Sequence, residues 1–337
     1  MFRRLHAYLA DSDRRACRPP VAVALQGGGA YGAFAWGVLD RLLEEREFYP
    51  AAMSGASAGA VNAVVTAWGL LEGGREGARS ALRQAWTSIG QMARLSPLGL
   101  PGADLQFELL TRLVSPYQFN PLNINPLRDL LGSMIDFDRL RRSCEMPLFI
   151  SATDVATGAQ RVFREFELSL DALMASSCVP HIYQAVEIDG RCYWDGGFSA
   201  NPPILPAVLE SACRSLLVVK LTPDVEPHLP TTAPDIFARL KRMLFNAPLL
   251  RDLDALEEMR RLLRRRSLLS FDLRRLRDLV VRTIAIDHGY FVPANGSGLD
   301  PRPELLLRLH DSGRAAAAAL IGGAPTTTVA LPLPRDD

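Results

Sequence analysis

Residues 21–32 read Val-Ala-Val-Ala-Leu-Gln-Gly-Gly-Gly-Ala-Tyr-Gly, and this stretch decides the fold. The five apolar residues at its start suit a short buried strand. The glycines that follow predict a turn, and apolar residues at helical spacing predict a helix over 33–46. A strand, a glycine turn and a helix in direct succession are typical of a parallel sheet covered by helices.

The same unit occurs a second time. Met53 closes another short apolar strand, residues 55–59 form a tight turn, and residues 58–71 predict a helix. We therefore expect a three-layer α/β/α fold with a mainly parallel central sheet. Further strands are predicted at 147–152, 161–163, 186–188, 215–221 and 283–286.

The rest of the chain divides less regularly. Prolines, among them Pro97, Pro101, Pro116 and Pro121, break the pattern in residues 88–146, where we expect an insertion that caps the site and whose clearest helix is 126–135. Residues 235–282 predict a basic helical segment, and residues 312–321 a closing helix. The expected organisation is an N-terminal arm over 1–18, a catalytic domain over 19–290, and a C-terminal helix with a flexible tail over 291–337.

Composition narrows the class of protein. The 337 residues are 48% hydrophobic and 22% charged, with a formal net charge of +1, which excludes a disordered chain and argues against nucleic-acid binding. The five cysteines are odd in number and none form C-x-x-C, which argues against a disulfide framework and a zinc site. We expect a reducing, cytoplasmic setting, no metal and no cofactor.

Neither a secretory signal nor a membrane span is expected. Asp11 and Asp13 interrupt the apolar run that a signal peptide needs. Residues 19–39 and 49–71 carry no charge, but glycines inside them would leave backbone groups unsatisfied in lipid. Both stretches are better explained as a buried strand, a turn and a buried helix.

The turn at Gly55-Ala-Ser-Ala-Gly59 carries the sharpest chemical signal. G-x-S-x-G between a strand and a helix is the pattern of a nucleophile elbow, in which small neighbours let a strained turn close around the serine. The hydroxyl of Ser57 then stands at a helix N-terminus, where free N–H groups favour developing negative charge.

The first glycine turn permits two interpretations. Its backbone N–H groups could form an oxyanion hole beside Ser57. However, Gly27-x-Gly29-x-x-Gly32 also fits a dinucleotide-binding fingerprint, which requires an acidic residue near the end of the second strand. In this sequence the second strand runs directly into the serine turn, so the acidic residue is not where that fingerprint needs it.

A third motif, Asp195-Gly196-Gly197, follows a predicted strand end and could by itself be only a turn. Together the three motifs resemble the patatin-like phospholipases, and the resemblance covers roughly residues 20–220. It implies a Ser–Asp dyad, with Ser57 as nucleophile and Asp195 as general base. The oxyanion hole would be formed by Gly28 and Gly29, with Gly27 and Ala30 at its edges. It further implies a lipid acyl hydrolase that works through an acyl-enzyme.

Three alternatives remain open at this stage. A Ser–His–Asp esterase would need a histidine after Asp195, and His288 is the best placed because it follows a predicted strand. A dinucleotide-binding module would use Gly27–Gly32. A catalytically silent lipid-binding relative would keep the fold without the reaction.

Residues 260–282 suggest contact with a lipid surface. They contain nine arginines and two aspartates, interleaved with leucines, a pattern compatible with an interfacial amphipathic helix. The competing explanation is a solvated helix whose leucines pack on the core. The expected partners are a lipid or acyl-ester substrate and the surface of a membrane or lipid granule.

Overall fold

The computed structural model describes residues 20–95, 114–223, 225–226, 229–266, 268–287 and 301–323. An eight-stranded sheet with the order β5-β6-β3-β2-β1-β7-β8 forms its centre, and β4 pairs with β3 outside this path. Strands β3, β2, β1, β7 and β8 run parallel, whereas β4, β6 and β5 are joined by antiparallel pairing. The strands are β1 (Val21–Leu25), β2 (Pro50–Gly55), β3 (Leu148–Asp154), β4 (Gln160–Arg164), β5 (Val186–Ile188), β6 (Arg191–Asp195), β7 (Ser215–Lys220) and β8 (Val280–Ala285).

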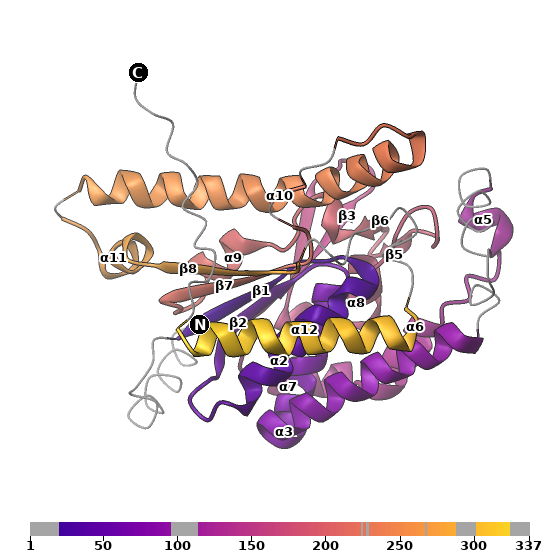
Figure 1. The fold of residues 1–337 in the computed structure, drawn as a ribbon, viewed down its shortest axis with the longest axis horizontal. Helices are drawn as coiled ribbons and strands as arrows, with labels where there is room; N and C mark the ends of the chain where they lie inside the picture. Colours follow the sequence, from indigo (N-terminus) through magenta and orange to yellow (C-terminus); the bar gives the residue numbers. More distant parts are fainter. Residues whose placement is uncertain are drawn as a thin grey trace.

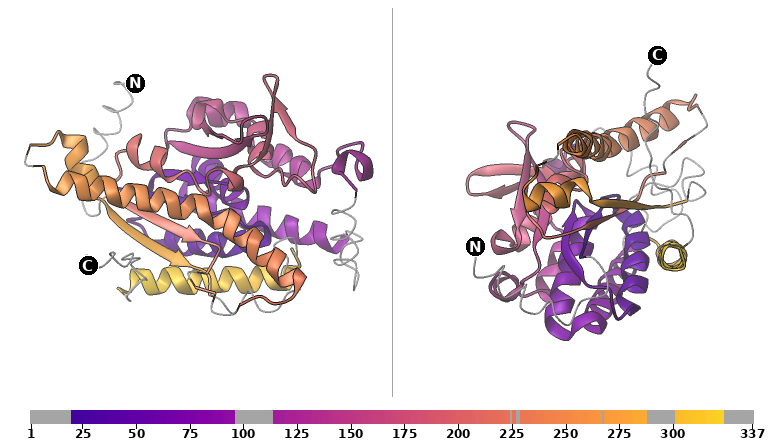
Figure 2. Two further views of the ribbon diagram at one scale, coloured as in Figure 1. Left: turned by 90° about the horizontal axis from the view of Figure 1, so that it is seen from above. Right: turned by 90° about the vertical axis from the view of Figure 1, so that its left-hand side faces the viewer.

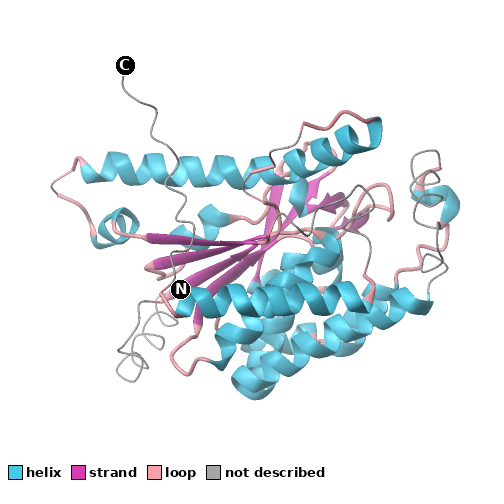
Figure 3. Ribbon diagram, viewed as in Figure 1, coloured by secondary structure: helices cyan, strands magenta, loops and turns pink. Residues whose placement is uncertain are grey.

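Helices cover both faces of the sheet (Figures 1 and 3). The first face carries α2 (Gly32–Glu44), α3 (Ala58–Leu95), α6 (Pro126–Met134), α7 (Phe137–Ser143), α8 (Leu170–Ser176) and α12 (Pro303–Ile321). The second carries α9 (Ile204–Leu209), α10 (Ala233–Arg264) and α11 (Phe271–Arg277). The short helix α5 (Pro116–Phe119) lies at one end of the molecule.

The alternation of side chains along β1 explains why the sheet is covered twice. Val23 and Leu25 belong to the core beneath α2 and α3, while Ala22 and Ala24 belong to the core beneath α9 and α10. All four are fully buried. A central parallel strand therefore needs apolar residues at every position, as residues 21–25 have. The three-layer α/β/α fold expected from the sequence is confirmed.

Several predicted boundaries were wrong. The stretch labelled α3 consists of two helices that meet at Gly73 and Gly74, where the backbone is not helical, so the expected helix end at 71 lies next to the observed break, while the second helix continues to Leu95, past the expected start of the insertion. Gly74 has φ 61°, a left-handed conformation that glycine adopts without strain. The second helix turns back along the first, because a Cβ on Gly69 would lie 2.4 Å from the Cα of Ala78 and the ring N–H of Trp86 donates to Asn62 at 2.8 Å. Helix α12 begins at Pro303, nine residues before the predicted start.

The basic segment is not one helix. Helix α10 ends at Arg264, α11 spans Phe271–Arg277, and β8 begins at Val280. Leu276 and Leu279 are buried in the second core, while Leu268 is 93% exposed. The interpretation of residues 260–282 as a continuous interfacial helix is therefore wrong, because the leucines serve different elements. Among the described helices, none combines the length and apolarity that crossing a bilayer requires.

Candidate active site

Ser57 lies on the tight turn between β2 and α3. Its φ is 52°, which is strained for a non-glycine residue, and it is 7% exposed. A Cβ on Gly55 would lie 2.5 Å from the carbonyl of Gly59, and a Cβ on Gly59 would lie 2.0 Å from the carbonyl oxygen of Leu25. Both glycines of the motif are thus required for the turn to close against β1.

The backbone of Ser57 is fixed by the end of α8. Its N–H donates to the carbonyl oxygen of Ser176 at 3.1 Å and to the Oγ of Ser176 at 3.0 Å. Ser176 is fully buried, and the neighbouring Ser177 has a buried hydroxyl with no partner among the described residues. Sequence reasoning missed Ser176, because nothing in its local pattern indicates a contact with a turn 119 residues earlier.

Asp195 ends β6 and is completely buried. Its N–H donates to the carbonyl oxygen of Cys178 at 2.8 Å, and its Oδ1 accepts from the N–H of Gly197 at 2.7 Å. Its Oδ2 has no hydrogen-bond partner within the described part of the chain. A buried carboxylate oxygen without a donor costs stability, so this atom is poised to receive one.

Burial raises the pKa of Asp195 to about 6. The hydroxyl of Ser57, the N–H of Gly197 and, more distantly, Lys241 act in the opposite direction by stabilising the ionised carboxylate. The side chains of Ser57 and Asp195 are therefore brought close together, without a well-formed hydrogen bond between them. Hydrogen bonds of this kind are commonly long in an enzyme without substrate.

The two glycines after Asp195 allow close packing. A Cβ on Gly196 would lie 2.2 Å from the carbonyl oxygen of Ser151, and a Cβ on Gly197 would lie 2.4 Å from the ring of Phe245. The Gly-Gly pair therefore lets Asp195 sit between β3 and α10. This explains by contact what the sequence alone could only describe as a turn.

The first glycine turn lies against Ser57. A Cβ on Gly27 would lie 2.7 Å from the carbonyl oxygen of Ala56 and 2.8 Å from the Cβ of Ser57. Gly28 has extended backbone with φ 177°, and Gly29 has φ 60° and is exposed. The N–H groups of Gly28 and Gly29 make no hydrogen bond to another described residue. Free N–H donors in such a turn can stabilise a developing negative charge.

The remaining residues of this turn support the helices. Ala30 is buried in a single 3-10 turn (Gly29–Tyr31) that leads into α2. A Cβ on Gly32 would lie 2.6 Å from the Cβ of Ala58, so this glycine lets α2 and α3 start side by side. Strand β2 ends at Gly55 and the next acidic residue is Glu72, far from the position that a dinucleotide fingerprint needs.

Two buried amides tie the glycine turn to the rest of the site. Gln26 is fully buried, and its Oε1 accepts hydrogen bonds from the N–H groups of Leu221 and Thr222 at 2.7 and 3.1 Å. Asn201 accepts from the N–H of Gly27 at 2.6 Å and donates to the carbonyl oxygen of Phe245 at 2.9 Å. Sequence reasoning missed the role of both, since their partners come from distant parts of the chain.

The described histidines are His181 and His310. His310 stacks on Trp36 at a ring-centroid distance of 4.0 Å and faces Asp40 between α12 and α2. His181 follows α8 and is partly buried. His288, the histidine considered for a triad, lies outside the described residues. Among the described residues, no cluster of His, Cys, Asp or Glu could hold a metal ion.

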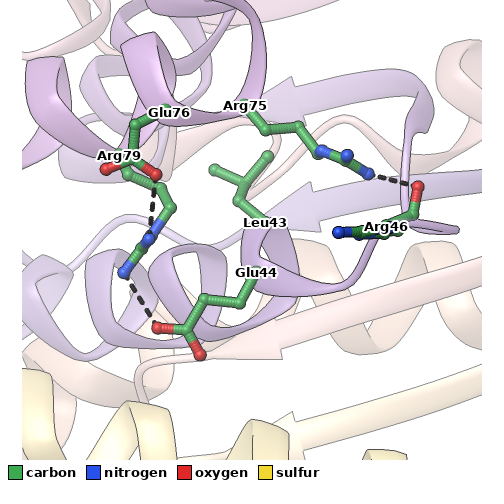
Figure 4. Close-up of a pocket in the computed structure, with 6 residues that line it drawn as sticks. All are labelled: Leu43, Glu44, Arg46, Arg75, Glu76 and Arg79. Atoms are coloured by element: carbon green, nitrogen blue, oxygen red, sulfur yellow. Dashed lines mark hydrogen bonds and ion pairs between the residues drawn. The ribbon is translucent and has the colours of Figure 1, made fainter.

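Two cavities lie near the sheet. One, of about 380 Å³, includes Met174 and Cys178 from the segment that contacts Ser57 and Asp195. The other, of about 390 Å³, lies between the end of α2 and α3 (Figure 4). Arg79 in that cavity is paired with Asp40, Glu44 and Glu76, so it is a structural ion-pair network apart from the serine.

A sequence model of the patatin-like phospholipases matches residues 23–208, which include all three glycine motifs. The chain belongs to the patatin-like phospholipase family. Patatin-like relatives are uncharacterized NTE family proteins of Mycobacterium tuberculosis and Mycobacterium bovis, 28% identical over 193 residues, which is 57% of this chain and 47% of theirs. The chain thus spans about half the length of the curated relatives it matches.

Two solved structures are also similar to this chain. VipD from Legionella pneumophila aligns over 91% of this chain and 68% of its own, with 14% identity and a TM-score of 0.46. The type III effector protein ExoU aligns over 91% of this chain and 53% of its own, with 15% identity and a TM-score of 0.38. The family assignment rests on the sequence match over residues 23–208. Membership of this family supports a lipid hydrolase.

Proposed function

We propose that this patatin-like protein is a lipid acyl hydrolase in which Ser57 and Asp195 form a catalytic dyad. The observation that carries the proposal is the unpartnered Oδ2 of the buried Asp195, whose pKa responds to the Ser57 hydroxyl. A serine hydroxyl needs a base to accept its proton, and a carboxylate with a pKa near 6 is ionised at neutral pH but more basic than an ordinary aspartate.

The proposed reaction has two halves. In the first, the Oγ of Ser57 attacks the ester carbonyl carbon while its proton passes to Asp195. The tetrahedral intermediate then collapses, and the leaving alcohol takes that proton. In the second, Asp195 accepts a proton from water as the water oxygen attacks the acyl-enzyme, and the acid product leaves as Ser57 recovers its proton.

The glycine turn supplies the proposed oxyanion hole. The N–H groups of Gly28 and Gly29 would donate to the oxygen that becomes negative, with Gly27 and Ala30 at the edges. Each donor of this kind lowers the barrier by about 3 kcal/mol. Support comes from the lack of competing hydrogen bonds at Gly28 and Gly29 and from the contact of Gly27 with Ser57.

A labelling experiment tests the dyad. A fluorophosphonate probe should modify wild-type protein at Ser57 and leave Ser57→Ala unmodified. The two proteins, assayed in parallel on phospholipids, triacylglycerols, acyl thioesters and polyesters, should identify the substrate class. Wild-type protein that resists the probe and hydrolyses none of these would support the catalytically silent alternative.

We further propose that the basic corner, defined as Arg265, Arg266, Leu268 and Phe271, contacts anionic lipid surfaces. Leu268 and Phe271 are 93% and 68% exposed. Some neighbouring arginines are neutralised, for example Arg261 by Glu258 and Arg277 by Asp278, which reduces the number of charges that can attract the lipid. Arginines near an anionic surface contribute about 1 kcal/mol each. The cytoplasmic location expected from the cysteines stays a prediction.

A further inference from the structure

One half of α10 presents an apolar strip to solvent. The strip consists of Ile236, Leu240, Met243 and Leu244, which are 41%, 47%, 59% and 61% exposed. Their spacing of four, seven and eight residues from the first places them on one face of the helix. A face of this kind normally packs against a core, so its exposure requires an explanation.

The other half of the same helix provides a comparison. Beyond Pro248, the side chains that α10 exposes include charged ones joined in ion pairs, such as Arg260 with Glu257 and Arg261 with Glu258. That half has the ordinary surface of a solvated helix. The exposed apolar character is therefore concentrated in the N-terminal half.

The strip ends at the candidate catalytic residues. Phe245, the next residue after Leu244, packs edge-on against Phe198 with ring centroids 4.8 Å apart. A Cβ on Gly197 would lie 2.4 Å from the ring of Phe245, so the ring packs directly on this glycine. Figure 1 and the left view of Figure 2 show the other half of α10 extending toward α11.

The two residues that follow the strip are hydrogen-bonded to the amides that support the glycine turn. The Oδ1 of Asn246 accepts from the Nε2 of Gln26 at 3.3 Å, and the carbonyl oxygen of Phe245 accepts from Asn201, which holds Gly27. A lipid surface seated on the strip would therefore adjoin Phe245 and Asn246, which contact Gly197 and Gln26 at the proposed site. Any displacement of α10 would also reach the proposed oxyanion hole.

The charges around the strip indicate the chemistry of its partner. Arg239 and Arg242 both pair with Glu226, at 3.0 and 2.7 Å, so both guanidinium groups are held within the protein and one of the two positive charges is balanced. Val225, beside Glu226, is 71% exposed and extends the apolar surface. An acidic protein or a nucleic acid would be bound by several unpaired cations, whereas an exposed apolar strip whose neighbouring arginines are held by a carboxylate suits acyl chains.

We propose that the strip is the surface by which the protein docks on a lipid aggregate, inserting these side chains among the acyl chains so that a lipid can reach Ser57. The proposal rests on the proposed lipid hydrolysis. In this proposal the N-terminal half of α10 binds the lipid surface. Binding of this kind comes from burial of apolar side chains and should therefore be insensitive to salt.

The test uses two matched double variants. Leu240→Gln with Leu244→Gln changes the strip. Leu209→Gln with Leu307→Gln changes two leucines of similar exposure, 51% and 53%, on α9 and α12. Flotation with phosphatidylcholine vesicles, which carry no net charge, measures binding in the Ser57→Ala background so that hydrolysis does not alter the vesicles. Hydrolysis of a water-soluble short-chain ester is measured with Ser57 intact.

We expect the strip variant to lose at least about tenfold in vesicle affinity, because two half-exposed leucines no longer enter the lipid. Its soluble-ester rate should match wild type, and the control pair should match wild type in both assays. The proposal is overturned if the strip variant binds vesicles as well as its parent, if both pairs lose binding equally, or if the parent does not bind. It is also overturned if the parent is a dimer that the strip variant dissociates.

A second readout does not depend on loss of function. Leu240→Trp places an indole in the strip, and brominated phosphatidylcholine should quench its fluorescence beyond the quenching seen for wild type. Equal quenching of both proteins would contradict insertion. Vesicle binding without hydrolysis of any ester by wild type would instead refute the proposed function and leave the docking surface standing.

Discussion

The N–H of Gly27 donates a 2.6 Å hydrogen bond to the Oδ1 of Asn201, 174 residues further along the chain. Asn201 follows Asp195 by six residues and is fully buried. Its amide group also donates to the carbonyl oxygen of Phe245. One side chain therefore joins the glycine turn, the segment that carries the proposed base, and α10.

This relationship predicts the effect of Asn201→Ala. The N–H of Gly27 would be left buried without an acceptor, which costs about 1–3 kcal/mol of stability. The glycine turn should also shift relative to Ser57, so kcat on a soluble ester should fall about 10- to 100-fold while KM changes little. Steady-state kinetics and chemical denaturation measure the two effects.

Asn246→Ala is the matched control for that change. Asn246 also contacts the buried amide cluster, through Gln26 and Thr222, but makes no hydrogen bond with the glycine turn. Its kcat should stay within about threefold of wild type, since the loss is that of an ordinary hydrogen bond. Equal losses in the two variants would mean that Asn201 acts through α10 and not through Gly27.

The pKa of Asp195 predicts the pH dependence of activity. Because burial raises this pKa to about 6, the base is protonated and inactive below that pH. On a soluble ester, kcat/KM should fall about tenfold for each pH unit below 6 and level off above it. An acid limb centred near pH 4 would show that the carboxylate is solvated in the working enzyme, contrary to its burial.

The same burial predicts that Asp195→Asn stabilises the protein. In wild type the ionised carboxylate is disfavoured in the folded state, so stability is lost as pH rises from 3.8 to about 6 and stays low above it. The variant lacks this penalty, and its free energy of unfolding at pH 8 should exceed that of wild type by up to about 3 kcal/mol. The advantage should disappear below pH 4, while activity is absent throughout.

Asp40→Asn should have the opposite effect. Asp40 is also buried, but its pKa lies well below the usual range because hydrogen bonds and charges from His310, Arg79 and Arg314 outweigh desolvation. Removing its charge leaves Arg79 and Arg314 without their buried partner, so stability at pH 8 should fall. Denaturation curves at pH 4 and pH 8 compare the two variants directly, and stabilisation by both would refute this account.

The elements nearest the nucleophile could be predicted from local sequence because their constraints are local. A strained turn between a buried strand and a helix needs small residues, and residues 55–59 satisfy this within five positions. Strand β1 was predictable for the same reason, since burial on both faces requires an unbroken apolar run. Asp195 followed only from the family resemblance, because its local sequence fits any turn.

The residues that sequence reasoning missed act across long separations. Ser176, Gln26 and Asn201 contact partners more than a hundred residues away, and a polar residue beside a strand end has no local mark of such a contact. The basic helical segment expected over 235–282 contains two helices and the start of a strand, because leucine spacing does not show where α10 ends and β8 begins. The strip on α10 has the apolar periodicity of a helix that packs on a core. Only the exposure of its side chains in the structure shows that it faces solvent.

His288→Ala separates the dyad from a triad. The proposed dyad gives His288 no role, so the variant should keep most of the wild-type activity on a soluble ester. Ser57→Ala and Asp195→Asn should each lose at least about a thousandfold. If His288→Ala were as inactive as Ser57→Ala, the Ser–His–Asp alternative would replace the dyad.

Replacing Arg264, Arg265 and Arg266 by serine separates the basic corner from the strip on α10. Arg264 forms an ion pair with Glu257 at 3.5 Å, so Arg265 and Arg266 should provide most of the attraction to anionic headgroups. Binding to vesicles rich in phosphatidylserine at low salt should weaken about tenfold, and the difference should vanish in 0.5 M salt as charges are screened. Binding to phosphatidylcholine should not change, because the strip is intact. Flotation at the two salt concentrations measures this, and loss of binding to both lipids would show that one surface performs both roles.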